Sequence, residues 1–228
     1  MSARPATVRV AAGQGFWGDW VEAPYRQVTG GPIDYLMMDY LAEVTMSILQ
    51  KQKSRDPALG YATDFITQME RILPTVVERG IKVTANAGGV NPRACAAALA
   101  EVARRLGLGG KLTIGVVTGD DLLRAARRLS WHGGMSSRTS IPAARSATCA
   151  IACSRRTPTS ERPRSSMPCS AARRSSLPGR VTDTGLTLGP LMHASDWSRD
   201  SWDLIAAGTV AGHIIECGAQ CERRQLSE

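Results

Sequence analysis

Long apolar runs, aromatic residues and an apolar amino-terminal segment are all scarce in this chain. Aromatic residues make up 5% of the 228 residues, and no stretch approaches the roughly 18 apolar residues that a membrane-spanning helix requires. Residues 1–5 lack the apolar core of a secretory signal peptide. We therefore expect a soluble, cytoplasmic protein without a membrane partner. The apolar content of 43% is enough for one sizeable α/β core.

Acidic residues are nearly absent from residues 124–178, which contain eleven Arg and no Lys but only one acid, Glu161. This stretch carries the positive charge of the chain, whose formal net charge is +8, so the remainder is slightly acidic. Because the stretch also lacks Phe and Tyr to stack on bases, we expect no nucleic-acid partner. Its Ser, Arg and Pro composition cannot offset the entropy of ordering by apolar burial and therefore predicts disorder.

Cysteine and histidine patterns give little support for a metal site. The six cysteines do not form a disulfide framework in a chain of this length without a secretion signal. Cys217 and Cys221 form an isolated C-x-x-x-C pair, which is weak support for a metal. His213 and Glu216 face the same way on a predicted helix. Such a pair usually forms a structural hydrogen bond; less commonly, it binds a metal or acts as a catalytic base and the residue that orients it. We predict no metal.

Apolar periodicity outside the arginine-rich stretch predicts strands that alternate with helices. Strands are expected at residues 7–12, 33–39, 81–85 and 112–117, and helices at 40–53, 62–79, 92–106 and 202–217. This alternation is typical of a mostly parallel sheet with flanking helices, as in Rossmann-like folds. We predict one incomplete α/β domain that is ordered over residues 6–123 and 179–221. Residues 124–178 interrupt it, and residues 222–228 form an aberrant tail.

A glycine-rich loop follows the first predicted strand. Gly13, Gly15 and Gly18 have the G-x-G-x-x-G spacing of dinucleotide-binding loops, although we expect Pro24 to interrupt the helix that would follow. Two interpretations remain open. The loop only turns the chain, or its backbone cradles the phosphate of a nucleotide or of coenzyme A.

Polar residues follow the other predicted strands as well, and residues 179–185 resemble another turn at the end of a strand. In open parallel sheets, ligands bind outside the carboxyl ends of the strands, so we expect these residues to form one site. The candidate catalytic side chains are Asp39, Asp120 and Asp183, and the candidate ligand-binding residues, besides the three glycines above, are Asn86, Gly88, Gly89 and Arg180. A structural alternative for Asp39 is that it caps the helix that follows.

Several long blocks of the sequence resemble the acyclic terpene utilisation family (AtuA-like). They are GQGFWGD, IDYLMMDYLAEVTMSIL, ANAGGVNPRACA, VVTGDDLL, GRVTDTGLTLGPLMH and WDLIAAGTVAGHIIECGAQ. The resemblance implies a role in the breakdown of acyclic terpenoids such as citronellol and geraniol through coenzyme A thioesters, so an acyl-CoA-type ligand is expected. It also leaves open a non-catalytic partner of an acyl-CoA carboxylase or another pathway complex. An NAD-dependent oxidoreductase that uses the glycine loop is a third, weaker possibility.

The resemblance breaks where the arginine-rich stretch begins. Three segments can be encoded by codons that give a family-like sequence when read in a neighbouring frame. Residues 155–162 then read SANAYLGA, residues 137–144 read LANIDTGR, and residues 222–226 read SGGNF. All three strings resemble family blocks expected at these points. We therefore hypothesise a frame-displaced insert that starts between Leu123 and Trp131 and ends near Gly179, and a second displacement after Cys221. Family members are longer, so we expect a truncated and impaired protein.

Overall fold

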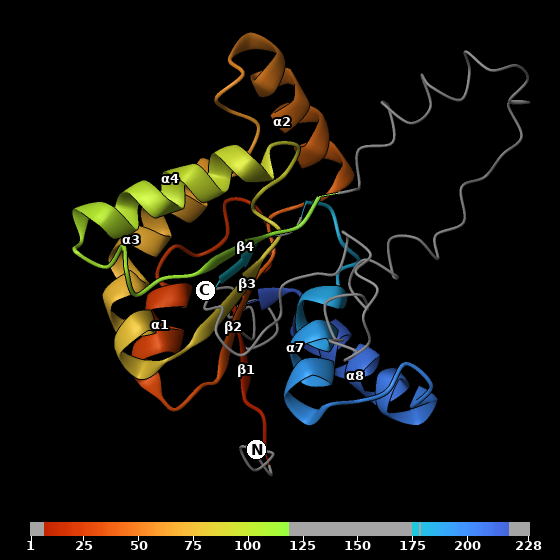
Figure 1. The fold of residues 1–228 in the computed structure, drawn as a ribbon. Helices are drawn as coiled ribbons and strands as arrows, with labels where there is room; N and C mark the ends of the chain where they lie inside the picture. Colours follow the sequence, from red (N-terminus) through yellow and green to blue (C-terminus); the bar gives the residue numbers. More distant parts are fainter. Residues whose placement is uncertain (1–6, 119–174, 178, 219–228) are drawn as a thin grey trace, which may run out of the picture.

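The computed structural model describes residues 7–118, 175–177 and 179–218, and its centre is a five-stranded sheet (Figure 1). The strand order is β1-β2-β3-β5-β4, and every neighbouring pair is parallel. The strands are β1 (Val10–Gln14), β2 (Tyr35–Met38), β3 (Lys82–Ala85), β4 (Ile114–Val116) and β5 (Ser175–Leu177). The predicted parallel α/β fold with flanking helices is confirmed.

Helices cover both faces of the sheet (Figure 1). One face carries α1 (Ala23–Gly30), α3 (Thr63–Arg79) and α4 (Pro92–Arg105), and the other carries α7 (Gly185–Ser195) and α8 (Trp202–Ile215). The strands β1, β2, β3 and β4 advance across the sheet in one direction, so right-handed crossovers place α1, α3 and α4 on the same face. Helix α2 (Glu43–Arg55) stands beyond the carboxyl ends of the strands.

Strand β2 joins two apolar clusters because both of its faces are covered. Leu36 and Met38 belong to the larger cluster, which includes residues of α3 and α4. Met37 belongs to a smaller cluster with Val181 and Leu186 on the α7 side. All four residues of β2 are buried. The continuous apolar sequence of this strand is what a central parallel strand requires.

Helices α1 and α2 differ from the sequence-based expectations. The expectation that Pro24 interrupts a helix is wrong, because α1 begins at Ala23 and Pro24 occupies its first turn. A proline costs little there, since the first amide groups of a helix have no partner within the helix. Helix α2 begins at Glu43 rather than at residue 40, because Ala42 has an extended backbone and its amide donates to the Thr45 hydroxyl at 2.6 Å.

Strand β5 comes from the end of the stretch that was predicted to be disordered. It pairs with β3 on one side and β4 on the other, and Leu177 is fully buried. The sheet therefore resumes before the predicted boundary at residue 179. The other residues of that stretch, 124–174 and 178, lie outside the described residues, as does the predicted tail at 222–228.

Candidate functional site

The order of the strands creates a switch point between β3 and β5. Strand β3 leads into α4 on one face of the sheet, whereas its neighbour β5 leads into α7 on the opposite face. Two adjacent parallel strands whose connections leave toward opposite faces open a crevice at their carboxyl ends, where ligands of open α/β sheets bind. The two loops at this point, residues 86–91 and 179–184, carry five of the predicted site residues.

Asp39 and Asn86 form a buried polar pair at this edge. The Asn86 side-chain amide donates to Asp39 Oδ1 at 2.6 Å, and its oxygen accepts the Tyr40 amide at 2.8 Å. The Leu41 amide also donates to Asp39 Oδ1, at 3.0 Å. Asp39 therefore turns the chain after β2 and does not cap α2. Its carboxyl group is held in one orientation by two neighbouring loops.

The environment of Asp39 favours its protonated form. Burial raises the pKa of Asp39 from 3.8 to about 6, against the lowering effect of the hydrogen bonds from Asn86 and Leu41. The negative charge of Asp183 raises the pKa further, while the positive charge of Arg180 lowers it. A carboxyl group with such a pKa can accept or donate a proton near neutral pH.

Arg180 connects the loop after β5 with the start of α2. Its Nη2 atom lies 3.1 Å from Glu43 Oε1, which joins residues 137 positions apart. Glu43 is exposed, so solvent screens this ion pair and it contributes little to stability. The structure thus brings together Asp39, Asn86, Arg180 and Asp183, which we call the Asp39 cluster.

The glycine loop after β1 packs against the end of α8. The Gly15 amide donates to Asp19 Oδ2 at 3.0 Å, and a Cβ atom at Gly15 would meet the Cys217 carbonyl oxygen at 2.5 Å. Gly18 has a positive φ of 96° and lies in the turn before α1 rather than inside a helix. This geometry favours the interpretation in which the loop turns the chain. Gly13 packs on Leu36 and Pro24.

Gly88 and Gly89 shape the turn between β3 and α4. The Gly89 amide donates to the Asn86 carbonyl at 3.2 Å, and the Gly88 carbonyl accepts the Asn91 amide at 2.9 Å. Gly89 has a φ of 52°, and a Cβ atom there would overlap the Leu49 side chain. Gly89 therefore allows α2 and the loop after β3 to approach each other.

A model of the acyclic terpene utilisation family protein AtuA matches residues 8–153 and 177–223. The chain belongs to the AtuA family. This confirms the resemblance carried by the sequence blocks on both sides of the arginine-rich stretch. No curated protein and no solved structure matches the chain.

The sequence-based predictions missed a series of hydrogen bonds between buried side chains of this AtuA-family protein. The Tyr40 hydroxyl donates to Gln68 Oε1 at 2.5 Å, and Gln68 Nε2 donates to Gln14 Oε1 at 3.0 Å. Gln14 Nε2 then donates to the Phe16 carbonyl at 2.9 Å. These hydrogen bonds link β1, the end of β2 and α3. The available signal was Gln68 itself, a polar residue on the otherwise apolar face of α3.

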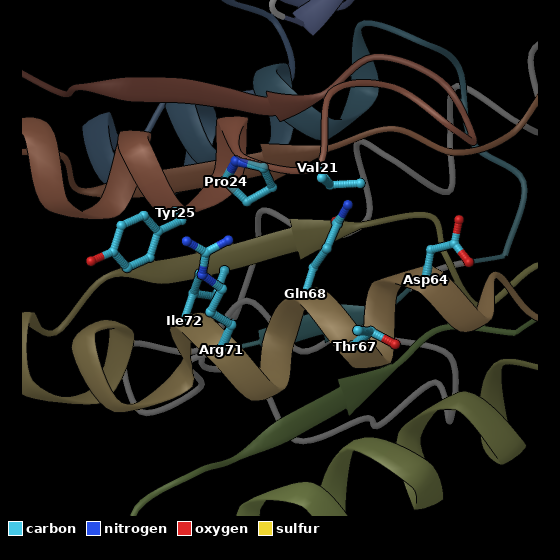
Figure 2. A pocket seen from close by; sticks show the side chains of 8 residues that line it. All are labelled: Val21, Pro24, Tyr25, Asp64, Thr67, Gln68, Arg71 and Ile72. Carbon is cyan, nitrogen blue, oxygen red and sulfur yellow. The ribbon is translucent and has the colours of Figure 1, made fainter.

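A pocket of about 330 Å³ lies between α1 and α3, and none of its lining residues belongs to the Asp39 cluster (Figure 2). At its rim, Arg71 forms two hydrogen bonds with Glu22 and lies over the Tyr25 ring at 4.2 Å. Arg71 is therefore held at the rim by contacts within the protein. The lining of the pocket is Val21, Pro24, Tyr25, Asp64, Thr67, Gln68, Arg71 and Ile72. We place the candidate site at the Asp39 cluster because titratable groups and the strand ends meet there.

The remaining predicted features lie on α8 or outside the described residues. His213 Nδ1 lies 3.2 Å from Glu216 Oε2, as the local pairing predicted. Asp120 and Cys221 fall outside the described part of this AtuA-family chain. Within residues 7–118, 175–177 and 179–218, no three His, Cys, Asp or Glu residues gather as a metal site would need, and no helix there is long and apolar enough to cross a bilayer.

Proposed function

We propose that this AtuA-family protein binds an acyl-CoA-type intermediate of acyclic terpenoid breakdown at the Asp39 cluster and that Asp39 exchanges a proton with it. The observation that carries the proposal is a buried carboxyl group with a pKa of about 6, at the carboxyl ends of parallel strands. Titratable groups perturbed in this way concentrate at functional sites. Membership of the acyclic terpene utilisation family supports an acyl-CoA-type ligand.

The residues of the cluster suit chemistry at a thioester. A thioester carbonyl makes the adjacent C–H group acidic, and a carboxylate with a pKa near neutrality can take that proton and return it. The negative charge that develops on the carbonyl oxygen requires a donor or a cation nearby. Arg180 supplies the cation, and Asn86 positions Asp39 through the hydrogen bond at 2.6 Å.

Calorimetric titration of the full chain tests the proposal. We expect an isoprenoid acyl-CoA to bind more tightly than free coenzyme A, and Arg180→Gln to weaken that binding by about tenfold, as for the loss of a charged hydrogen bond. Arg55→Gln is the matched control, since Arg55 is exposed in the last turn of α2. Failure of the wild-type chain to bind any coenzyme A thioester contradicts the proposal and favours a non-catalytic role in a pathway complex.

We also propose that part of residues 124–178 is displaced coding sequence, which would leave the protein impaired. The family match leaves residues 154–176 unmatched, and these lie inside the predicted displaced segment. The match does continue over residues 124–153, beyond the predicted start of the displacement. Sequencing the gene and its messenger RNA tests the proposal. An uninterrupted frame without compensating insertions or deletions around this segment would exclude displacement.

A further inference from the structure

Helix α8 exposes an unusually apolar outer face. Its inner face approaches α7 closely, because a Cβ atom at Gly208 would meet Leu188 at 2.8 Å and one at Gly212 would meet Thr184 at 2.9 Å. On the outer side, Trp202, Val210 and Ile214 are 69%, 59% and 62% exposed. The outer face of a surface helix is normally polar, and a contiguous exposed apolar face usually marks an interaction surface.

The pattern of this face is self-complementary about Gly208. Trp202 and Ile214 lie six residues before and after that position, and Asp203 and His213 lie five residues before and after it. If two copies of α8 pack antiparallel across a two-fold axis, Trp202 of each copy meets Ile214 of the other. Asp203 then meets His213 at both ends of the pair. The small exposed residues Ala206 and Ala207 fall beside Val210 near the axis.

The charges at the two ends of α8 distinguish this arrangement from others. His213 Nδ1 lies 3.2 Å from Glu216 Oε2, so when the ring carries both protons its Nε2–H group is the donor that would meet the carboxylate of a facing Asp203. A parallel pair would place like charges, Asp203 on Asp203, against each other. Opposite charges facing across an interface select partner and register, and isologous two-fold contacts are the commonest way in which soluble proteins self-associate.

We infer that the outer face of α8 is a dimerisation surface for a second copy of this chain, packed antiparallel. Helix α8 has 14 residues and is therefore about 21 Å long. One such face is smaller than the roughly 800 Å² per partner of a standard interface. The dimer is accordingly weak, and its population depends on protein concentration.

Sedimentation of the full chain over about two orders of magnitude in concentration tests the inference. We expect a reversible monomer–dimer equilibrium, with Val210→Asp weakening association by at least about tenfold, as for the loss of a central contact. Val44→Asp is the matched control, because Val44 is also an exposed helical valine, on α2 and 70% accessible, and its substitution should leave the equilibrium unchanged. A monomer at every concentration, or equal effects of the two substitutions, overturns the inference.

A charge exchange tests the antiparallel register. Asp203→Lys alone and His213→Glu alone should each weaken the dimer by about tenfold, since each places like or unpaired charges opposite each other. The double variant should recover most of the wild-type association. Circular dichroism of the four proteins checks that the helix content is unchanged. If the double variant dimerises more weakly than either single variant, by the sum of their separate effects, the antiparallel pairing is ruled out.

Discussion

Replacing Asp39 by asparagine removes the ionisable group from the centre of the candidate site while keeping its shape. Burial raises the pKa of Asp39 from 3.8 to about 6, so the folded protein holds the ionised form at a cost. Each pKa unit corresponds to about 1.4 kcal/mol, which gives a cost of about 3 kcal/mol for ionised Asp39 in the folded state. The Asp39→Asn side chain can still accept the amides of Asn86 and Leu41 through Oδ1.

The sign of the pH dependence follows from the direction of this shift. Between pH 4 and 6 the folded protein retains the Asp39 proton, whereas the unfolded chain has lost it. The contribution of Asp39 to the free energy of unfolding therefore falls as the pH rises through this window and stays low above it. Asp39→Asn lacks this slope. We expect the variant to be more stable than wild type by up to about 3 kcal/mol at pH 7.5 and equally stable near pH 4.

Urea unfolding followed by tryptophan fluorescence at several pH values measures this difference. A gain of this size raises the melting temperature by about 2 to 4 °C per kcal/mol for a chain of this length. Asp200→Asn, a substitution at an exposed aspartate, is the control and should show no such pH-dependent gain. If Asp39→Asn lowers stability, or changes it equally at pH 4 and pH 7.5, the reasoning about burial is refuted.

Three further predictions concern packing and burial. Gly15→Ala should lower the free energy of unfolding by about 1 to 3 kcal/mol, because the new methyl group overlaps the Cys217 carbonyl. In the same urea assay, Gly30→Ala is the control and should leave the free energy of unfolding unchanged, because a Cβ atom at Gly30 faces open space. Burial raises the pKa of the Cys95 thiol to about 12, so iodoacetamide at pH 8 should modify Cys217 in the native protein and Cys95 only after unfolding, as peptide mass spectrometry would show. Tyr40→Phe leaves a buried amide oxygen without its donor and should lower the free energy of unfolding, measured in urea, by about 1 to 3 kcal/mol.

The parallel sheet and the centre of the candidate site were predictable from local patterns. The apolar sequence of β2 indicates a strand buried on both faces, and Asp39 and Asn86 each follow a strand directly. Because parallel strands end at one edge, the rule that ligands bind there was enough to group these two residues. Arg180 and Asp183 were added because residues 179–185 resemble a turn at the end of a strand, although that strand, β5, was not predicted.

Contacts between distant parts of the chain were not predictable. The glycine motif left open whether its loop cradles a phosphate or only turns the chain. The structure of the loop depends on the packing of the end of α8, some 200 residues later in the chain. The hydrogen bonds between Gln14 and Gln68 likewise depend on how α3 lies on β1. Strand β5 has only three residues, which is too short for a periodic pattern to be recognised. Its place in the sheet comes from its neighbours, β3 and β4.

The most direct test of the central claim is a titration of Asp39 itself in the presence and absence of ligand. In protein labelled with carbon-13 at the aspartate carboxyl groups, we expect one signal to titrate near pH 6, to disappear in Asp39→Asn and to shift when an isoprenoid acyl-CoA is added. Asp183→Asn should lower the pKa of that group, since it removes a neighbouring negative charge. An Asp39 signal that titrates near pH 4 and does not respond to the acyl-CoA would contradict the account.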